Sequence, residues 1–236
     1  RLLENGANSS FVNQIFDPDV SSLTLTSDPF DKFGTPGPDI ANPKDIFAPN
    51  RVNSAGFDLA DPEVLFALQQ ARFEPRIWKF GTQGEAHKVF SPATGSEIGQ
   101  VRFLSAQDAE AKINSAEPWQ ASAIKRAAVL RRVADLYESH ADDIFTLLTH
   151  EAGKTLLDCI GELREAVDFL RFYAAEVELN PLSPAGIFVC ISPWNFPLAI
   201  FTGQIAAALA SGNGVLAKPA ESTSMISYFA VELLHL

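Results

Sequence analysis

The 236-residue sequence has a formal net charge of −11 and an ordinary globular composition, with 47% hydrophobic and 20% charged residues. This composition excludes collagen-like, low-complexity and wholly disordered chains. A pI near 4.8 disfavours nucleic-acid binding, because phosphate contacts need clustered lysine and arginine. No stretch has the 18 or more apolar residues of a transmembrane helix. Two cysteines cannot form a disulfide framework, which favours a reducing compartment.

The first seventy residues differ from the rest, with ten acidic residues, four basic residues and seven of the fifteen prolines. Five of these prolines lie within residues 28–50, which argues against a helix or a central strand there. Residues 1–15 resemble a truncated helix followed by a capped turn. We therefore predict a long connector over residues 17–57, which wraps a surface or links two folded units. A helix is then expected from the Asp61-Pro62-Glu63 start to about Phe73.

Regular elements are predicted from residue 76 onward. Turns that contain glycine separate three short strand candidates: Ile77–Phe80, His87–Phe90 and Ile98–Val101. Apolar residues at helical spacing then predict four helices, at Ser105–Ser115, 121–139, 141–152 and 155–178.

The end of the sequence alternates between strand and helix. Gly186–Ser192 is a nearly continuous apolar run, which favours a strand covered on both faces. A helix over Pro197–Ala210, a strand over Gly214–Ala217 and a helix capped by Ser222 and reaching Leu236 follow. Because strand, helix and strand at this spacing form a βαβ unit, we expect a parallel sheet and an α/β fold.

Two glycine-containing segments resemble phosphate-binding motifs but fail in context. Residues 152–155 match the end of a P-loop, yet Leu148 stands where its first glycine belongs, and the segment lies between predicted helices. Gly212-x-Gly214-x-x-Ala217 fits a dinucleotide fingerprint, but it follows a helix and enters a strand, the reverse of the required order. We interpret it as a helix-ending turn.

The histidines and cysteines do not predict a metal site or a nucleophile. None of the four histidines has metal-ligand spacing to another histidine or a cysteine. Cys159 lies inside a predicted helix and Cys190 inside a predicted strand, so both are interpreted as packed thiols.

The segment Ile191–Pro197 is the most informative one. Prolines on both sides of Trp194-Asn195-Phe196 fix an irregular turn at the end of an apolar strand, where open α/β sheets bind ligands. The amide of Asn195 could stabilise a developing oxyanion. Alternatively, the aromatic side chains only pack and the asparagine satisfies backbone groups. Local chemistry leaves both alternatives open.

Several motifs together resemble the aldehyde dehydrogenase superfamily. Residues 192–197 and 212–221 are similar to its cofactor-binding half, and Arg126-Ala127, 151–155 and 165–170 to its preceding helices. Within this superfamily the sequence resembles the bacterial bifunctional proline-utilisation flavoenzymes in particular. Residues 1–13 resemble the last helix of their proline dehydrogenase barrel, and residues 51–59 resemble their interdomain connector.

The resemblance implies a fragment with three parts. Residues 1–16 would end the proline dehydrogenase barrel, residues 17–75 would form a linker with a short helix, and residues 76–236 would be the N-terminal, NAD-binding part of a Rossmann-like aldehyde dehydrogenase domain. The catalytic cysteine and the general-base glutamate of the family would lie beyond residue 236, so the fragment itself should be inactive.

The resemblance also implies roles for individual residues. Asn195 would be catalytic, since its amide would donate to the oxygen of the thiohemiacetal formed when a cysteine attacks the aldehyde. Arg1 would match an arginine that binds the proline carboxylate. The implied cofactor-binding residues are Ile191, Ser192, Pro193, Trp194, Asn195, Lys218, Ala220 and Glu221, with Lys218 and Glu221 at the adenosine ribose. A carboxylate there repels a 2′-phosphate, so NAD should be preferred to NADP. Without the resemblance, Lys218 and Glu221 would be interpreted as an exposed ion pair.

The implied parent protein oxidises proline with FAD and then oxidises glutamate semialdehyde to glutamate with NAD. The resemblance further implies a homo-oligomer that is cytoplasmic or peripheral at the inner membrane, with no nucleic acid bound through this region. Two alternatives remain: a non-catalytic nucleotide-binding or scaffold module of the same fold, and another NAD-dependent aldehyde dehydrogenase fused to an unrelated leader.

Overall fold

The structure is a computed structural model that describes residues 10–32, 41–74 and 76–236. It divides into two compact units, residues 1–41 and 42–236. The described part of the first unit contains the helices α2 (Phe11–Phe16) and α3 (Ser22–Leu25) and the 3-10 turn η1 (Pro29–Lys32). Ser10 caps α2 by accepting a hydrogen bond from the backbone of Asn13, so the described part of the predicted N-terminal helix and turn is a capped helix.

The predicted connector contains more helix than expected. The helix α3 lies within it and is capped by Ser21, whose hydroxyl accepts from the backbone of Thr24. In the proline-rich part, η1 and a second 3-10 turn, η2 (Pro43–Asp45), both begin at a proline. A proline is tolerated at a first helical position because the N–H that it lacks has no partner there. The prolines therefore shorten the helical segments rather than exclude them.

The helices of the second unit follow the sequence prediction closely. Their bounds are α4 (Pro62–Phe73), α5 (Ala106–Ser115), α6 (Ala123–Ser139), α7 (Ala141–Ala152) and α8 (Leu156–Leu179). Polar caps set these bounds: Asp61 accepts from the backbone of Glu63, and Ser105 and Thr155 cap α5 and α8. None of the helices in the described part of the chain is long and apolar enough to cross a membrane.

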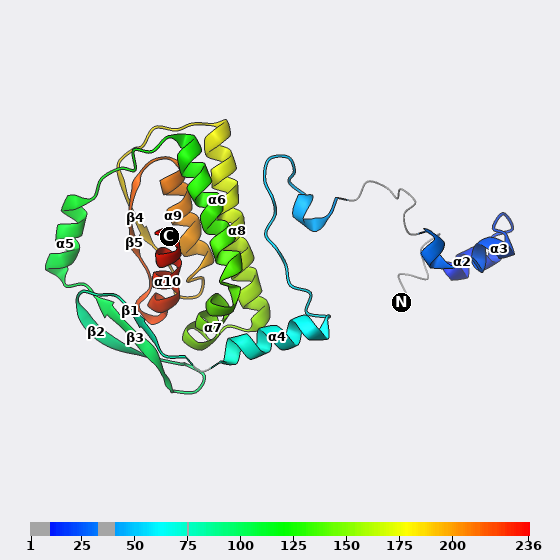
Figure 1. The fold of residues 1–236 in the computed structure, drawn as a ribbon, viewed down its shortest axis with the longest axis horizontal. Coiled ribbons are helices and arrows are strands. Elements are labelled where there is room, and N and C mark those ends of the chain that lie inside the picture. Colours follow the sequence, from blue (N-terminus) through cyan, green and yellow to red (C-terminus); the bar gives the residue numbers. More distant parts are fainter. Residues whose placement is uncertain (1–9, 33–40, 75) are drawn as a thin grey trace. The chain divides into compact units, whose positions relative to one another are not determined.

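The core lies between α6, α8 and the helix α9 (Ala199–Ala210). Figure 1 shows α6 and α8 side by side, and α9 packs against α8. Leu130 of α6, Leu170 of α8 and Phe201 of α9 are fully buried. Burying one such side chain stabilises the fold by roughly 1.5–3 kcal/mol, so this layer supplies much of the stability of the unit.

Two separate sheets flank the helices. In the first, β3 (Glu97–Phe103) lies between β1 (Trp78–Phe80), which is parallel to it, and β2 (Glu85–Phe90), which is antiparallel. In the second, β4 (Ile187–Ile191) and β5 (Gly214–Lys218) are parallel and joined through α9. The prediction of a parallel βαβ unit is therefore confirmed.

The βαβ unit differs from the prediction in three details. The strand β4 is not covered on both faces by the described residues, since Val189 at its centre is 59% exposed. The helix α9 begins at Ala199 and not at Pro197. The last helix, α10 (Ser224–Leu234), has Thr223 and not Ser222 at its N-cap, because residues 221–223 tighten into the 3-10 turn η3.

Residues 51–57, here called the strap, lie along the helices α6 and α8, and Figure 1 shows the strap running beside α8 to the start of α4. Asp168 of α8 accepts hydrogen bonds from the backbone N–H and the hydroxyl of Ser54, both at 2.8 Å. Arg171 of α8 donates to the carbonyl of Asn53 at 3.3 Å and to Glu138 of α6. This part of the predicted connector therefore wraps a helical surface.

Candidate functional site

The carboxyl ends of β4 and β5 bring the candidate residues together. In the parallel register, Ile191 is paired with Lys218, and the N–H of Ser192 donates to the carbonyl of Lys218 at 3.2 Å. Residues 192–198, here called the Asn195 turn, leave β4 at this edge, while Lys218, Ala220 and Glu221 leave β5 beside it. This edge is where open parallel sheets bind their ligands.

Side chains from the last helix and the turn before it hold the Asn195 turn. The hydroxyl of Ser227 in α10 donates to the carbonyl of Pro197 at 2.8 Å, and the hydroxyl of Thr223 donates to the carbonyl of Trp194 at 3.4 Å. Ser227 is buried, so its bond is shielded from water. The path of the chain through the turn is therefore fixed from a distant part of the sequence.

The side chain of Asn195 is exposed, and it has no hydrogen bond within the described part of the chain. Trp194 is also largely exposed, at 61%, and Phe196 is partly exposed. The amide therefore points away from the apolar core and is available to a ligand. Its catalytic role remains a prediction.

Lys218 and Glu221 form an ion pair on the surface, with 2.5 Å between Nζ and Oε1. Both side chains are mostly exposed, and the neighbouring ammonium lowers the pKa of the Glu221 carboxyl. This is the surface pair expected from the residues alone, and it lies at the predicted edge. Its function as a ribose-binding pair stays a prediction.

The other predicted cofactor residues lie at the same edge. The hydroxyl of Ser192 is buried and has no hydrogen-bond partner among the described residues, while Ile191 is exposed and Pro193 is half-buried. An unpaired buried hydroxyl costs free energy, which a hydrogen bond to a ligand would recover. Arg1, the predicted proline-binding residue, lies outside the described residues.

Two buried glutamates lie at the N-termini of two helices, α9 and α10. Glu162 of α8 accepts from the backbone N–H groups of Leu198 and Ala199, at 3.1 and 2.8 Å, where α9 begins. Glu151 of α7 accepts from the N–H groups of Met225 and Ile226, at 2.7 and 2.8 Å, where α10 begins. Helix N-termini are common phosphate sites, but these two already hold a carboxylate.

The two buried carboxylates differ in their surroundings. Desolvation raises the pKa of the Glu151 carboxyl to about 7, although three backbone hydrogen bonds oppose the shift. Glu162 is compensated by Lys154, whose Nζ lies 2.7 Å from Oε1. The contact is an ion pair without a well-directed hydrogen bond, since Oε1 has no hydrogen-bond partner among the described residues.

Lys154 also faces the Asn195 turn. Its Nζ lies 4.9 Å from the centroid of the Phe196 ring, which is within cation–π range. In the sequence, residues 151–155 and 165–170 were noted only because they resemble helices of the family. No role was predicted for Lys154, Glu162 or Glu151. The available signal was an acidic residue on the apolar stripe of a helix, at Glu151 and Glu162.

The cysteines and the glycine-rich turn behave as predicted. Cys159 is fully buried and its pKa is raised to about 11 by desolvation, while burial also raises the pKa of Cys190. Gly212 has a φ of +86° directly after α9, and the side chain of Asn213 accepts from the backbone of Gly186 at 3.0 Å. The thiols are therefore packed, and the Gly212 segment is a helix-ending turn. The described residues contain no group of three or more side chains suited to a metal ion.

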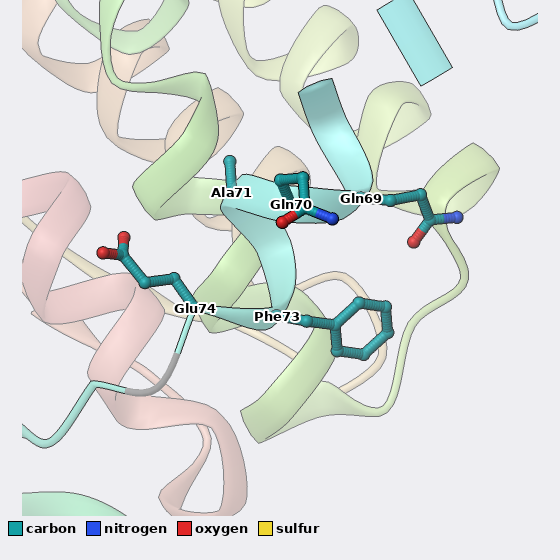
Figure 2. Close-up of a pocket in the computed structure, with 5 residues that line it drawn as sticks. All are labelled: Gln69, Gln70, Ala71, Phe73 and Glu74. Atoms are coloured by element: carbon teal, nitrogen blue, oxygen red, sulfur yellow. The ribbon is translucent and has the colours of Figure 1, made fainter. Parts of the chain in front are cut away.

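A separate hollow lies on the second unit, at the end of α4. Figure 2 shows its lining, which comes from Gln69, Gln70, Ala71, Phe73 and Glu74, and its volume is about 580 Å³. It contains none of the predicted site residues and only one titratable side chain, Glu74. The hollow therefore does not compete with the edge of β4 and β5 as the candidate site.

Comparisons with known proteins bear on this edge and on the rest of the chain. Residues 78–236 match the aldehyde dehydrogenase family. The chain is 43% identical to the bifunctional protein PutA of Escherichia coli (strain K12) over 99% of its own length, and it spans 20% of that relative.

Solved structures show the same likeness. A mutant of proline utilization A (PutA) from Bradyrhizobium japonicum is matched over the whole chain, with a TM-score of 0.74, 38% identity and 24% of that protein covered. A mutant 1-pyrroline-5-carboxylate dehydrogenase from Thermus thermophilus is matched over 78% of the chain and 42% of that protein, with a TM-score of 0.68 and 26% identity.

Proposed function

Because the chain belongs to the aldehyde dehydrogenase family, we propose that it supplies the NAD-binding part of an enzyme that oxidises proline to glutamate in two steps. The first step, with FAD, would form the precursor of glutamate semialdehyde, and the second, with NAD, would oxidise that aldehyde. The parent protein would act as a homo-oligomer. The likeness to PutA supports the two-step assignment, because it extends beyond the family match that begins at residue 78.

One observation carries the assignment of the NAD site: the parallel register places the Asn195 turn beside Lys218 and Glu221. The ammonium and carboxylate can hydrogen-bond the ribose hydroxyls, and the unpaired hydroxyl of Ser192 is available at the same edge. When bound, NAD would supply the group that accepts a hydride from the substrate. Because the N-termini of α9 and α10 hold glutamates, the phosphates of the cofactor would need other donors.

Asn195 would act on the aldehyde oxygen. Its exposed amide can donate to an oxygen that becomes negatively charged, and a fixed donor stabilises this charge without reorganising. Neither cysteine of the chain suits the role of nucleophile, since both are buried and have a raised pKa. We therefore assign the nucleophile and the general base to other parts of the complete protein, and the 236-residue chain alone should oxidise neither substrate.

The proposal is tested on the complete gene product that contains this chain. We expect proline-dependent reduction of a dye and NAD-dependent oxidation of glutamate semialdehyde. Glu221→Ala should weaken NAD binding several-fold and reduce the preference for NAD over NADP, because the carboxylate that would repel a 2′-phosphate is removed. Cofactor titrations and the dependence of rate on NAD concentration measure both effects.

The matched control is Glu97→Ala. Glu97 also forms an exposed ion pair, with Lys88 at 2.6 Å, but it lies on β3 in the other sheet. This variant should bind NAD like the parent. Equal NAD affinity for Glu221→Ala and the parent would contradict the ribose assignment, and absence of both activities would contradict the proposed function.

A further inference from the structure

The orientation of Asn195 depends on its neighbours. Its own side chain has no hydrogen bond in the described part of the chain, so the amide is aimed by the backbone of the turn. On one side, the carbonyl of Trp194 accepts a long bond of 3.4 Å from Thr223. On the other side, Phe196 faces Lys154 and is followed by residues bound to Glu162. The second side is the more firmly held.

The backbone of Lys154 is held in place independently of the Asn195 turn. It follows Gly153, whose φ of +68° ends α7, and its own N–H donates to the carbonyl of Leu148 at 3.2 Å. Thr155 then caps α8. The backbone of Lys154 is therefore anchored between two helices, and its side chain is mostly buried, at 15% exposure.

Glu162 connects this cation to the backbone of the turn. One carboxylate oxygen, Oε2, accepts from the N–H groups of Leu198 and Ala199, and the other, Oε1, lies 2.7 Å from the Lys154 ammonium. The carboxylate is 2% exposed, so the ion pair is little screened by water. The same ammonium lies against the ring of Phe196. Phe196 and Leu198 are thus attached to one buried ion pair.

We propose that Lys154 and Glu162 are positioning residues for the Asn195 amide, an inference that rests on the function proposed above. Together with the bond from Ser227 to the carbonyl of Pro197, the pair holds the residues that follow Asn195 in the turn, and thereby fixes the direction of the amide relative to the edge of β4 and β5. Among the described residues it has no hydrogen bond or ion pair with Lys218 or Glu221, so its loss should lower the rate of the chemical step more than the affinity for the cofactor.

The test uses Lys154→Met in the complete gene product. Asn195→Ala should lower the kcat for semialdehyde oxidation by roughly 10²–10³-fold, as expected for an oxyanion donor. Lys154→Met should lower kcat by about tenfold or more, because a small misplacement of a catalytic group is costly, and it should leave the KM for NAD within about twofold. Lys154→Arg, which keeps the cation, should restore most of the rate.

A double variant separates positioning from a general structural effect. If Lys154 acts through Asn195, Lys154→Met should cause no further loss of kcat in the Asn195→Ala background. If Lys154→Met lowers kcat by the same factor in the Asn195→Ala background as in the parent, the inference is overturned. Lys125→Met, at an exposed lysine on α6, is the matched control and should not change kcat.

Two further variants keep the inference testable if Lys154→Met does not fold. Lys154→Met combined with Glu162→Gln removes both buried charges and keeps an acceptor for the start of α9. Phe196→Leu removes the ring and leaves the ion pair intact. Each should lower kcat only when Asn195 is present. Unchanged kcat in Phe196→Leu would overturn the inference, whereas unchanged kcat in Asn195→Ala would instead contradict the proposed function.

Discussion

At the scale of single residues, Glu151 shows how a buried acid can stabilise a helix and still be sensitive to pH. Its carboxylate satisfies two N–H groups at the start of α10, but it lies in the core with its pKa raised from 4.5 to about 7. A raised pKa means that the folded chain holds this proton more tightly than the unfolded chain. The stabilising contribution of the group is therefore complete below pH 4.5 and is lost as the pH rises through 7.

We expect Glu151→Gln to remove this dependence on pH. Between pH 5 and 7 the carboxyl of Glu151 holds a proton in the folded parent and releases it in the unfolded chain. Each increase of one pH unit therefore lowers the free energy of unfolding by roughly 1 kcal/mol. The glutamine variant should lack this slope. Urea denaturation at a series of pH values measures it.

Glu178→Gln is the matched control for this titration. The hydrogen bond from Arg131 lowers the pKa of Glu178 from 4.5, so the folded chain does not take up a proton at this carboxyl between pH 5 and 7 as it does at Glu151. Its replacement should leave the slope unchanged. An identical slope in the parent and Glu151→Gln would show that Glu151 does not titrate in this range.

The sequence could predict that the candidate site residues lie at one edge of a sheet, but it could not predict the residues that support them. Asn195, Lys218 and Glu221 stand in short motifs, and the parallel sheet expected from the βαβ pattern places them at one edge. Glu151 and Glu162 meet their backbone partners across 74 and 36 positions of sequence. No local pattern pairs a helical acid with a distant helix N-terminus, so their roles depended on the structure.

At the scale of elements, the strap depends on the helix α8. Asp168 is the common acceptor for Ser54 and Arg51 of the strap, and the ring of Phe47 lies 3.7 Å from the Arg51 guanidinium. If this carboxylate were lost, the buried backbone N–H of Ser54 would be left without an acceptor, while its hydroxyl would keep only the bond that it accepts from Arg164 at 3.2 Å.

Asp168→Ala should therefore destabilise the second unit by about 1–3 kcal/mol, the cost of leaving a buried polar group unsatisfied. Asp135→Ala is the control, because Asp135 also pairs with an arginine of α8, Arg171, but is 72% exposed. That change should cost less than about 1 kcal/mol. Urea denaturation compares the two variants; equal effects would show that the contacts of Asp168 with the strap add no stability.

Helices that begin at a clear polar N-cap residue were predicted most accurately. Polar caps at Asp61, Ser105 and Thr155 fix the starts of α4, α5 and α8. The start of α10 was wrong because two candidate caps, Ser222 and Thr223, are adjacent, and only the three-dimensional path of η3 selects between them. The exposure of β4 was also wrong, because an apolar run shows what a strand can bury and not what covers it.

At the scale of the molecule, the sheet of β4 and β5 has no further strand on either side within the part of the chain that the structure describes, and it has an exposed apolar surface. The exposed side chains on β4 include Phe188, Val189 and Ile191. An unpaired apolar strand is a template for pairing with another chain. We expect the 236-residue chain to self-associate as its concentration rises.

Val189→Lys should reduce this self-association, because a charge at the centre of β4 opposes strand pairing. Its effect on the unfolding midpoint should be small, since Val189 is mostly exposed. Ile113→Lys is the control: Ile113 is similarly exposed but lies on α5, where the backbone is already hydrogen-bonded. Sedimentation velocity over a range of concentrations measures the outcome, and equal association of the two variants would contradict the role of β4.

The unbroken length of α8 has a mechanical consequence. Glu162 and Asp168 lie on this one helix, separated by about 9 Å along its axis at the usual rise per residue. The first secures the bend that carries Asn195, and the second secures Ser54. Tension on the segment around Ser54 would therefore reach that bend through a stiff rod, without crossing a flexible joint.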